Sequence, residues 1–146
     1  MSDERNFDAL KLENQICFPL YAASREVVKR YRPFLEPLNL TYTQYIAMLV
    51  FWEQKKCSVK ELGERLYLDS GTLTPVLKSL EAKGFVRRYR STEDERVLLV
   101  EVTEEGMRLR ERASGVPEQL NACVRLSAEE ARQLYDLLYR LLGTIE

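Results

Sequence analysis

The stretch that decides the fold is residues 58–106, SVKELGERLYLDSGTLTPVLKSLEAKGFVRRYRSTEDERVLLVEVTEEG. Its first half contains two short segments in which leucine or valine returns every three or four residues, a helical spacing. Ser58 precedes the first segment and Asp69 or Ser70 precedes the second, and these residue types cap helices. Gly84 follows the second segment as a stop signal. This half therefore predicts two consecutive short helices.

The second half of the stretch reads as a hairpin. Residues 85–90 and residues 97–102 are short segments rich in valine, leucine and aromatic side chains, as strands are. Residues 91–96 between them are too polar to be buried, and they form an exposed turn. Two helices followed by a hairpin predict a winged helix-turn-helix. We therefore expect a mainly α fold with a small β-hairpin wing.

A helical segment lies on the N-terminal side of this lobe. Apolar side chains spaced by three or four residues predict a helix from about Lys11, which Pro33 and Pro37 end. Pro19 either kinks that helix or marks a helix start near Phe18, because proline removes one backbone donor. A second helix is capped by Thr41 and is apolar nearly all round over residues 45–52, so we expect it to be buried. Residues 53–56 are expected to be a polar loop.

Two further helices follow the lobe, over residues 103–112 and from the capping box at Ser127 to the end. The last helix carries a coiled-coil-like seam of Ala131, Leu134, Leu138, Leu141 and Ile145. Since no other long helix remains to cover this seam, a partner chain is its simplest cover. We therefore expect residues 10–40 and 107–146 to dimerise and residues 58–106 to be the DNA-binding lobe of one single domain, residues 1–146.

The composition excludes several classes of function. The chain has 146 residues, 45% of them apolar, and no apolar run approaches the roughly 18 residues of a spanning helix. The first 14 residues lack the apolar run of a signal peptide, so we expect a cytoplasmic protein without a membrane partner. The absence of histidine excludes histidine-based catalysis, and three scattered cysteines suggest neither a zinc site nor a disulfide framework. We expect no metal and no cofactor.

The second predicted helix and the wing have the composition of a DNA-contacting surface. Between Lys78 and Arg90 there are five cations and one anion, Glu81. Small polar groups at a helix N-terminus can approach base edges and phosphates, and an arginine on a hairpin tip suits a narrow minor groove. The candidate DNA-binding residues are Asp69, Ser70, Thr72, Thr74, Lys78, Arg88, Arg90 and Arg96. The alternatives remain that Asp69 is only a cap and that residues 87–90 are a solvated edge strand.

Several segments resemble a known family. The residues Asp94-Glu95-Arg96, Val102-Thr103 and Gly106 resemble the wing signature of the MarR family of transcriptional regulators, with Val102 where the family usually has leucine. Residues 12–18, 40–45 and 63–75 resemble the family's organic hydroperoxide sensors, the OhrR group. The resemblance runs from about Leu10 to Leu142, and Pro19 is a departure from the group's pattern.

This resemblance implies a homodimeric repressor that is not an enzyme and that releases operator DNA when an N-terminal cysteine, here Cys17, is oxidised by an organic hydroperoxide. It implies that Tyr31 and Tyr42 of the other subunit hold the thiolate, which is the form that attacks a peroxide. In two-cysteine members a C-terminal cysteine resolves the sulfenic acid, and Cys123 lies in about the right place. One-cysteine members pair instead with a small cellular thiol.

Each of these residues has a second interpretation. Cys17 and Cys123 could be inert cysteines, and the two tyrosines could be interface packing. Cys57 is expected to be a loop bystander, although Lys55 and Lys56 precede it. The whole chain could also be a repressor released by a small aromatic ligand, or a thiol peroxidase that uses Cys17.

Overall fold

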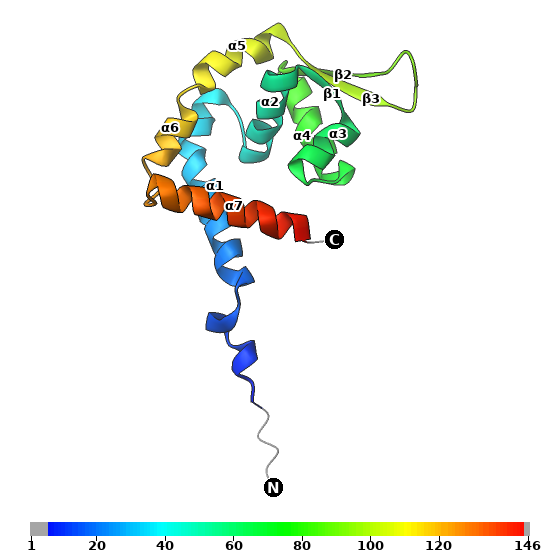
Figure 1. Cartoon of the computed structure of the whole chain (residues 1–146). Helices are drawn as coiled ribbons and strands as arrows, with labels where there is room; N and C mark the ends of the chain where they lie inside the picture. Colours follow the sequence, from blue (N-terminus) through cyan, green and yellow to red (C-terminus); the bar gives the residue numbers. More distant parts are fainter. Residues whose placement is uncertain (1–5, 145–146) are drawn as a thin grey trace.

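The structure is a computed structural model that describes residues 6–144. Its α-helices are α1 (Cys17–Leu35), α2 (Tyr42–Gln54), α3 (Val59–Leu66), α4 (Ser70–Ala82), α5 (Glu104–Ala113), α6 (Val116–Asn121) and α7 (Ala128–Thr144). Its strands are β1 (Lys56–Ser58), β2 (Val86–Arg90) and β3 (Leu98–Val102). Three 3-10 turns cover Asp8–Leu10, Leu12–Asn14 and Glu36–Leu38. The element order α3, α4, β2, β3 confirms the predicted winged helix-turn-helix (Figure 1).

The first helix differs from the expectation at both ends. The expected start at Lys11 is wrong, because residues 8–14 form only 3-10 turns and α1 begins at Cys17. Pro19 is the third residue of α1, where the backbone N–H has no partner within the helix, so it marks a start rather than a kink. Pro33 does not end α1, because its fixed φ suits a helix and only one hydrogen bond near the C-terminus is lost.

The sheet has three strands rather than the two of a simple hairpin. Its order is β1-β3-β2, with both pairings antiparallel. In β1, Cys57 lies opposite Val100 of β3, and Lys56 lies opposite Glu101. The prediction of a loop before Ser58 is therefore wrong at the C-terminal end of that loop, and Cys57 is a strand residue. A strand of three residues is too short to have a visible alternation, and only its pairing with β3 defines it.

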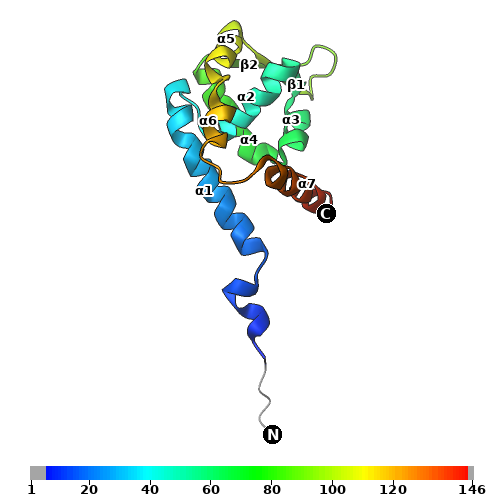
Figure 2. The same ribbon diagram turned by 60° about the vertical axis from the view of Figure 1, so that its left-hand side comes forward.

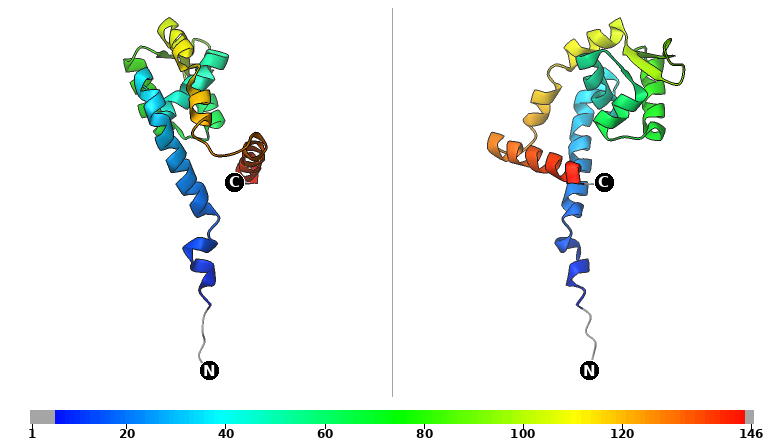
Figure 3. Two further views of the ribbon diagram at one scale, coloured as in Figure 1. Left: turned by 90° about the vertical axis from the view of Figure 1, so that its left-hand side faces the viewer. Right: turned by 45° about the vertical axis from the view of Figure 1, so that its right-hand side comes forward.

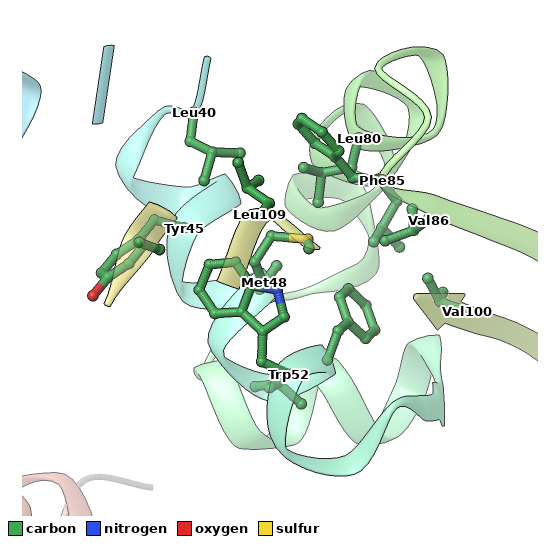
Figure 4. Close-up of a cluster of buried hydrophobic side chains, with 14 of the residues drawn as sticks. Leu40, Tyr45, Met48, Trp52, Leu80, Phe85, Val86, Val100 and Leu109 are labelled. Atoms are coloured by element: carbon green, nitrogen blue, oxygen red, sulfur yellow. The ribbon is translucent and has the colours of Figure 1, made fainter. Parts of the chain in front are cut away.

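The core lies where α2 meets α4, α5 and the base of the wing. Helix α2 is buried over most of its circumference, as predicted, and its N-terminus has a complete Thr41–Gln44 capping box. Figure 4 shows Met48 and Trp52 of α2 among Leu80, Phe85, Val100 and Leu109. This core holds α4 and the wing in one body.

Gly106 allows the wing to pack tightly on α5. A Cβ atom at this position would lie 2.2 Å from the carbonyl oxygen of Phe85 and 2.7 Å from Cγ2 of Val102. The indole N–H of Trp52 donates a 2.8 Å hydrogen bond to the carbonyl oxygen of Gly106. Thr103 caps α5 through its hydroxyl and also donates to the carbonyl oxygen of Gly84 at 2.6 Å. These contacts fix the end of β3 against α2.

The first and last long helices leave apolar faces uncovered within one chain. The N-terminal half of α1 extends away from the core, and α7 stands apart from it (Figures 2 and 3). Ile16, at the N-cap of α1, is 86% exposed, and none of the described residues of α7 is buried. Over Ala131 to Leu141 the predicted seam of α7 is exposed in this chain apart from a half-buried Leu138, and Ile145 lies outside the described residues.

Candidate nucleic-acid interface and sensor site

The N-terminus of α4 presents small polar side chains to solvent. Asp69 is the N-cap, and its Oδ1 accepts a 2.7 Å hydrogen bond from the backbone N–H of Thr72. This bond holds the pKa of the Asp69 carboxyl below its usual value. Thr74 donates to the carbonyl oxygen of Ser70 at 2.7 Å, which leaves the hydroxyl oxygen free to accept. Lys78, about two turns after Ser70, is also exposed. The helix thus offers the arrangement that major-groove binding requires.

The wing tip holds one arginine in a defined orientation. The side chain of Arg96 is 91% exposed, and its Nε lies 3.0 Å from Oδ1 of Asp94. Its Nη2 donates to Oδ2 of the same carboxylate at 3.2 Å. This fork holds the pKa of Asp94 below its usual value, and the backbone N–H of Arg96 also donates to Asp94. Asp94 therefore orients Arg96 without covering it.

Arg88 has a different environment from the exposed Arg90. The carboxylate of Glu81 accepts from the backbone N–H of Arg88 at 3.0 Å and from its guanidinium at 3.1 Å. The hydrogen bonds from Arg88 hold the pKa of Glu81 below its usual value. Arg88 is half-buried and joins the last turns of α4 to β2, so it positions the wing. Arg90 is exposed and available to a ligand.

The cysteine expected to act as sensor lies at the first position of α1, and its side chain is exposed. An open hollow of about 680 Å³ lies beside it, lined by Lys11, Leu12, Glu13, Gln15, Phe18 and Pro19. Leu12, Phe18 and Pro19 supply the apolar part of this lining, and Lys11, Glu13 and Gln15 supply the polar part. An organic molecule has room to approach the start of α1.

Tyr31 and Tyr42 form one aromatic cluster with Tyr45. The ring centroids of Tyr31 and Tyr42 are 4.9 Å apart, and those of Tyr31 and Tyr45 are 5.7 Å apart. Burial, with a further contribution from Tyr42 and Tyr45, raises the pKa of Tyr31 to about 12, and burial also raises the pKa of Tyr42. Both phenols therefore stay protonated at neutral pH, and each keeps an O–H donor.

The tyrosine pair and Cys17 of the same chain are far apart. Tyr31 follows Cys17 by 14 residues in the continuous helix α1, which corresponds to about 21 Å at about 1.5 Å per residue. A tyrosine side chain cannot span that distance. The structure thus brings Tyr31 and Tyr42 together, as the sequence interpretation requires, and leaves them without the cysteine of their own chain.

The other two cysteines differ in accessibility. Cys123 is exposed just after α6, and its thiol donates a long 3.5 Å hydrogen bond to the carbonyl oxygen of Gln119. Helix α6 packs against α1 (Figure 2). Cys57 is 3% exposed, and burial raises the pKa of its thiol to about 11. Cys57 is therefore an unreactive core residue.

A polar cluster between α2 and α4 was not found from the sequence. Oε1 of Gln44 accepts from the ammonium of Lys83 at 2.8 Å, and Nε2 of Gln44 donates to the hydroxyl of Ser79 at 2.9 Å. The Thr41–Gln44 capping box was visible in the sequence, but its partners lie 35 and 39 residues away. Lys83, counted with the basic residues of the lobe, is bound to the protein here.

Residues 6–144 contain no cluster of three or more histidine, cysteine, aspartate or glutamate side chains that could hold a metal ion. Over the same residues, no helix has the length and apolar character needed to cross a membrane.

Comparison with known proteins gives a consistent relationship. Residues 29–112 match the family described as transcriptional regulator SarA/Rot. The organic hydroperoxide resistance transcriptional regulator of Bacillus subtilis strain 168 is 51% identical over 142 residues, 97% of each chain. The structure of reduced AbfR bound to DNA, a protein of Staphylococcus epidermidis, has a TM-score of 0.76 and 34% identity, covering 92% of this chain and 93% of that one.

A second structure of AbfR, with a disulfide formed, has a TM-score of 0.65 at the same 34% identity, covering 91% of this chain and 93% of that one. The relationship extends over almost the whole chain, in sequence and in structure. The chain therefore belongs to the MarR family of winged-helix transcriptional regulators, in the group of organic hydroperoxide resistance regulators.

Proposed function

We propose that this chain is a redox-sensing transcriptional repressor. As a homodimer it binds operator DNA when reduced, and it releases the DNA when Cys17 is oxidised by an organic hydroperoxide. The observation that carries the proposal is the Tyr31–Tyr42 pair, 4.9 Å between ring centroids, at about 21 Å along α1 from the cysteine of its own chain. Such a pair can hold the Cys17 thiolate only if a second chain brings it.

The uncovered faces of α1 and α7 support a homodimer. Apolar side chains on both helices are exposed in the single chain, among them Ile16, Leu134 and Leu141. A twofold arrangement that buries residues 10–40 and 107–144 of both chains would remove this surface from water. It would also allow Cys17 of each chain to approach the tyrosines of its partner.

The exposed residues of α4 and the wing support DNA as the ligand. Ser70, Thr72, Thr74 and Lys78 would face the major groove, with Arg90 and Arg96 on the wing. Asp69 acts as the cap that fixes the helix N-terminus, and Arg88 acts through the position of the wing. The solved structure of reduced AbfR is one bound to DNA.

The chemistry of the sensor requires a thiolate and a two-electron oxidant. The Cys17 thiolate attacks the distal oxygen of the hydroperoxide, so an S–O bond forms and the O–O bond breaks. The organic oxygen leaves as an alcohol after it takes a proton, and Cys17 becomes a sulfenic acid. Hydrogen bonds from the partner's Tyr31 and Tyr42 hold the reacting thiolate. The apolar side chains of Leu12, Phe18 and Pro19 in the hollow at the start of α1 favour an organic peroxide over hydrogen peroxide.

Cys123 of the partner subunit then resolves the sulfenic acid. Its thiol attacks the sulfur of Cys17, an S–S bond forms, the S–O bond breaks, and water leaves. Both thiols are exposed in the reduced single chain. The disulfide requires Cα atoms about 4.4–6.8 Å apart, so it must move the dimerising helices.

Two alternative functions make different predictions that can be tested. A thiol peroxidase would consume many equivalents of peroxide with a reductant, and a ligand-controlled repressor would release DNA under reducing conditions. The exposed, oriented Arg96 and the polar N-terminus of α4 have no use in a peroxidase. The predicted cytoplasmic location stays a prediction.

The proposal is tested with a DNA duplex selected from a random pool on the reduced protein. We expect cumene hydroperoxide to release the duplex and to produce a covalent dimer on non-reducing electrophoresis. Cys17→Ser should abolish both effects, and Cys123→Ser should abolish the covalent dimer together with the release of DNA that the disulfide drives. In a mixture of the two variants, each dimer that contains one chain of either kind should regain one disulfide. Release of the duplex from Cys17→Ser by peroxide would overturn the proposal.

A further inference from the structure

We propose that Gln44 and Lys83 are positioning residues that couple the tyrosine site to α4 within one subunit. This inference rests on the proposed function of Cys17 as the trigger. It assigns the step between a change at Tyr42 and a change in the orientation of the DNA-contacting helix.

The coupling begins in the first turn of α2. Tyr42 is the first residue of α2 and Gln44 is the third, so both belong to one hydrogen-bonded turn. The side chain of Gln44 returns to the backbone N–H of Thr41 at 3.0 Å, and Thr41 Oγ1 accepts from the backbone N–H of Gln44. A displacement of Tyr42 therefore displaces the amide of Gln44 with it.

The amide of Gln44 is bound to the second half of α4. Its Nε2 donates to the hydroxyl of Ser79 at 2.9 Å, and its Oε1 accepts from the ammonium of Lys83 at 2.8 Å. The same ammonium donates to the carbonyl oxygen of Asn39 at 2.6 Å. Asn39 has a left-handed backbone, with φ 57°, at the end of the turn that precedes α2. One ammonium thus ties α4 to both sides of the Thr41 cap.

The burial of this cluster makes it stiff. Gln44 is 6% exposed, and withdrawal of its amide from Ser79 and Lys83 would leave buried polar atoms without partners. Lys83 is half-buried, and this partial withdrawal from water lowers the pKa of its ammonium. Moving α4 together with the first turn of α2 avoids that cost. The cluster therefore favours a coupled movement over a local one.

The opposite end of α2 supplies a matched control. Arg65 of α3 donates to Oε1 of Gln54 at 2.8 Å and lies 3.0 Å from a carboxylate oxygen of Glu53. This link also joins α2 to the DNA-binding lobe, but it lies about three turns from Tyr42. Its removal should leave the coupling unchanged.

The test measures the dissociation constant of the selected duplex for reduced and peroxide-oxidised dimers. The coupling is the ratio of the oxidised value to the reduced value. We expect Ser79→Ala and Lys83→Met to lower this ratio at least tenfold, because oxidation no longer moves α4. The dissociation constant of the reduced dimer should stay within about threefold of the wild-type value. The rate of Cys17 oxidation should not change. Lys83→Arg should restore most of the ratio, since a guanidinium can donate to both acceptors.

Ser79→Ala separates this role from simple electrostatics, because it removes no charge and changes one hydroxyl. Arg65→Met should keep the wild-type ratio. A wild-type ratio in both Ser79→Ala and Lys83→Met, or equal weakening of the reduced and oxidised complexes, would overturn the proposal. If the wild-type dimer itself shows no effect of peroxide on DNA binding, the proposed function fails, and the coupling fails with it.

Discussion

Tyr31 and Tyr42 lie on different helices, yet their ring centroids are only 4.9 Å apart, and burial raises the pKa of both phenols above the ordinary tyrosine value. The two O–H groups therefore form a pair of donors whose spacing is fixed by the packing of α1 on α2. An anion that reaches this pair receives hydrogen bonds without bringing a cation into the interface.

We predict that Tyr42→Phe slows the oxidation of Cys17 by cumene hydroperoxide about tenfold to a hundredfold. The lost hydrogen bond to a charged group is worth about 1.5–3 kcal/mol. The rate of sulfenic acid formation, measured by stopped flow with peroxide in excess, checks it. Tyr45→Phe is the control, because Tyr45 belongs to the same aromatic cluster but is buried. Equal rates in the two variants would contradict a role for the Tyr42 hydroxyl.

The wing arginine gives a second prediction. We expect Arg96→Ala to weaken binding of the reduced protein to the selected duplex about tenfold and to reduce the slope of log K against log salt by about one. Asp94→Asn should have a smaller effect in the same direction, because Asp94 orients the guanidinium. Fluorescence anisotropy at several salt concentrations measures both. Arg110→Ala on α5 should leave the slope unaltered, and a similar loss there would argue for a general charge effect.

Cys57 gives a prediction that concerns reactivity and pH. Its thiol has a pKa of about 11 in the folded protein against an ordinary value of 9.0. In the Cys17→Ser/Cys123→Ser protein, we expect no reaction with a thiol reagent at pH 8 until denaturant unfolds the chain. Since the folded state favours the neutral thiol, its contribution to stability is complete below about pH 9. That contribution is lost as the pH rises through about 11.

The difference in the free energy of unfolding between this variant and its Cys57→Ala derivative, measured by urea unfolding from pH 8 to pH 11, follows this contribution. Fast labelling of the folded protein at pH 8 would show that β1 opens readily and that the burial of Cys57 does not protect it.

Gly106 gives a prediction about stability. We expect Gly106→Ala to lower the free energy of unfolding by about 3 kcal/mol, because the added methyl group meets the carbonyl oxygen of Phe85 at 2.2 Å. Gly115→Ala is the control, since a Cβ there has no neighbour within 4 Å. Its effect should stay within about 0.5 kcal/mol. Urea unfolding compares the two, and equal losses would mean that the contact at Gly106 relaxes freely.

The parts of the fold that sequence could predict are those with local signals. The caps at Thr41, Ser58, Asp69 and Ser127 are all present, because each depends on residues no more than three positions apart. Strand β1 was missed because only Val100 and its neighbours, more than 40 positions away, define it. The end of α1 was misplaced because proline statistics describe helix interiors, and Pro33 lies in a last turn.

The candidate functional residues divide in the same way, into those that local sequence patterns predict and those whose partners only the structure shows. The resemblance predicted Cys17, Tyr31 and Tyr42 by pattern, and the structure adds that the two tyrosines touch while the cysteine of the same chain is out of reach. The count of five cations between Lys78 and Arg90 includes Arg88 and Lys83, and in the structure Glu81 and Gln44 hold these two side chains. Charge counts along a sequence cannot distinguish a bound cation from an available one, because the partner comes from another element.

The hydrogen bond from Trp52 to the carbonyl oxygen of Gly106 has a practical consequence. Trp52 is the single tryptophan of the chain, and it lies where α2 meets the base of the wing. Its fluorescence is therefore a built-in optical reporter of that junction, which needs no dye and no added label. Because α2 also carries Tyr42, we expect the same signal to change after a peroxide pulse, before any DNA is present.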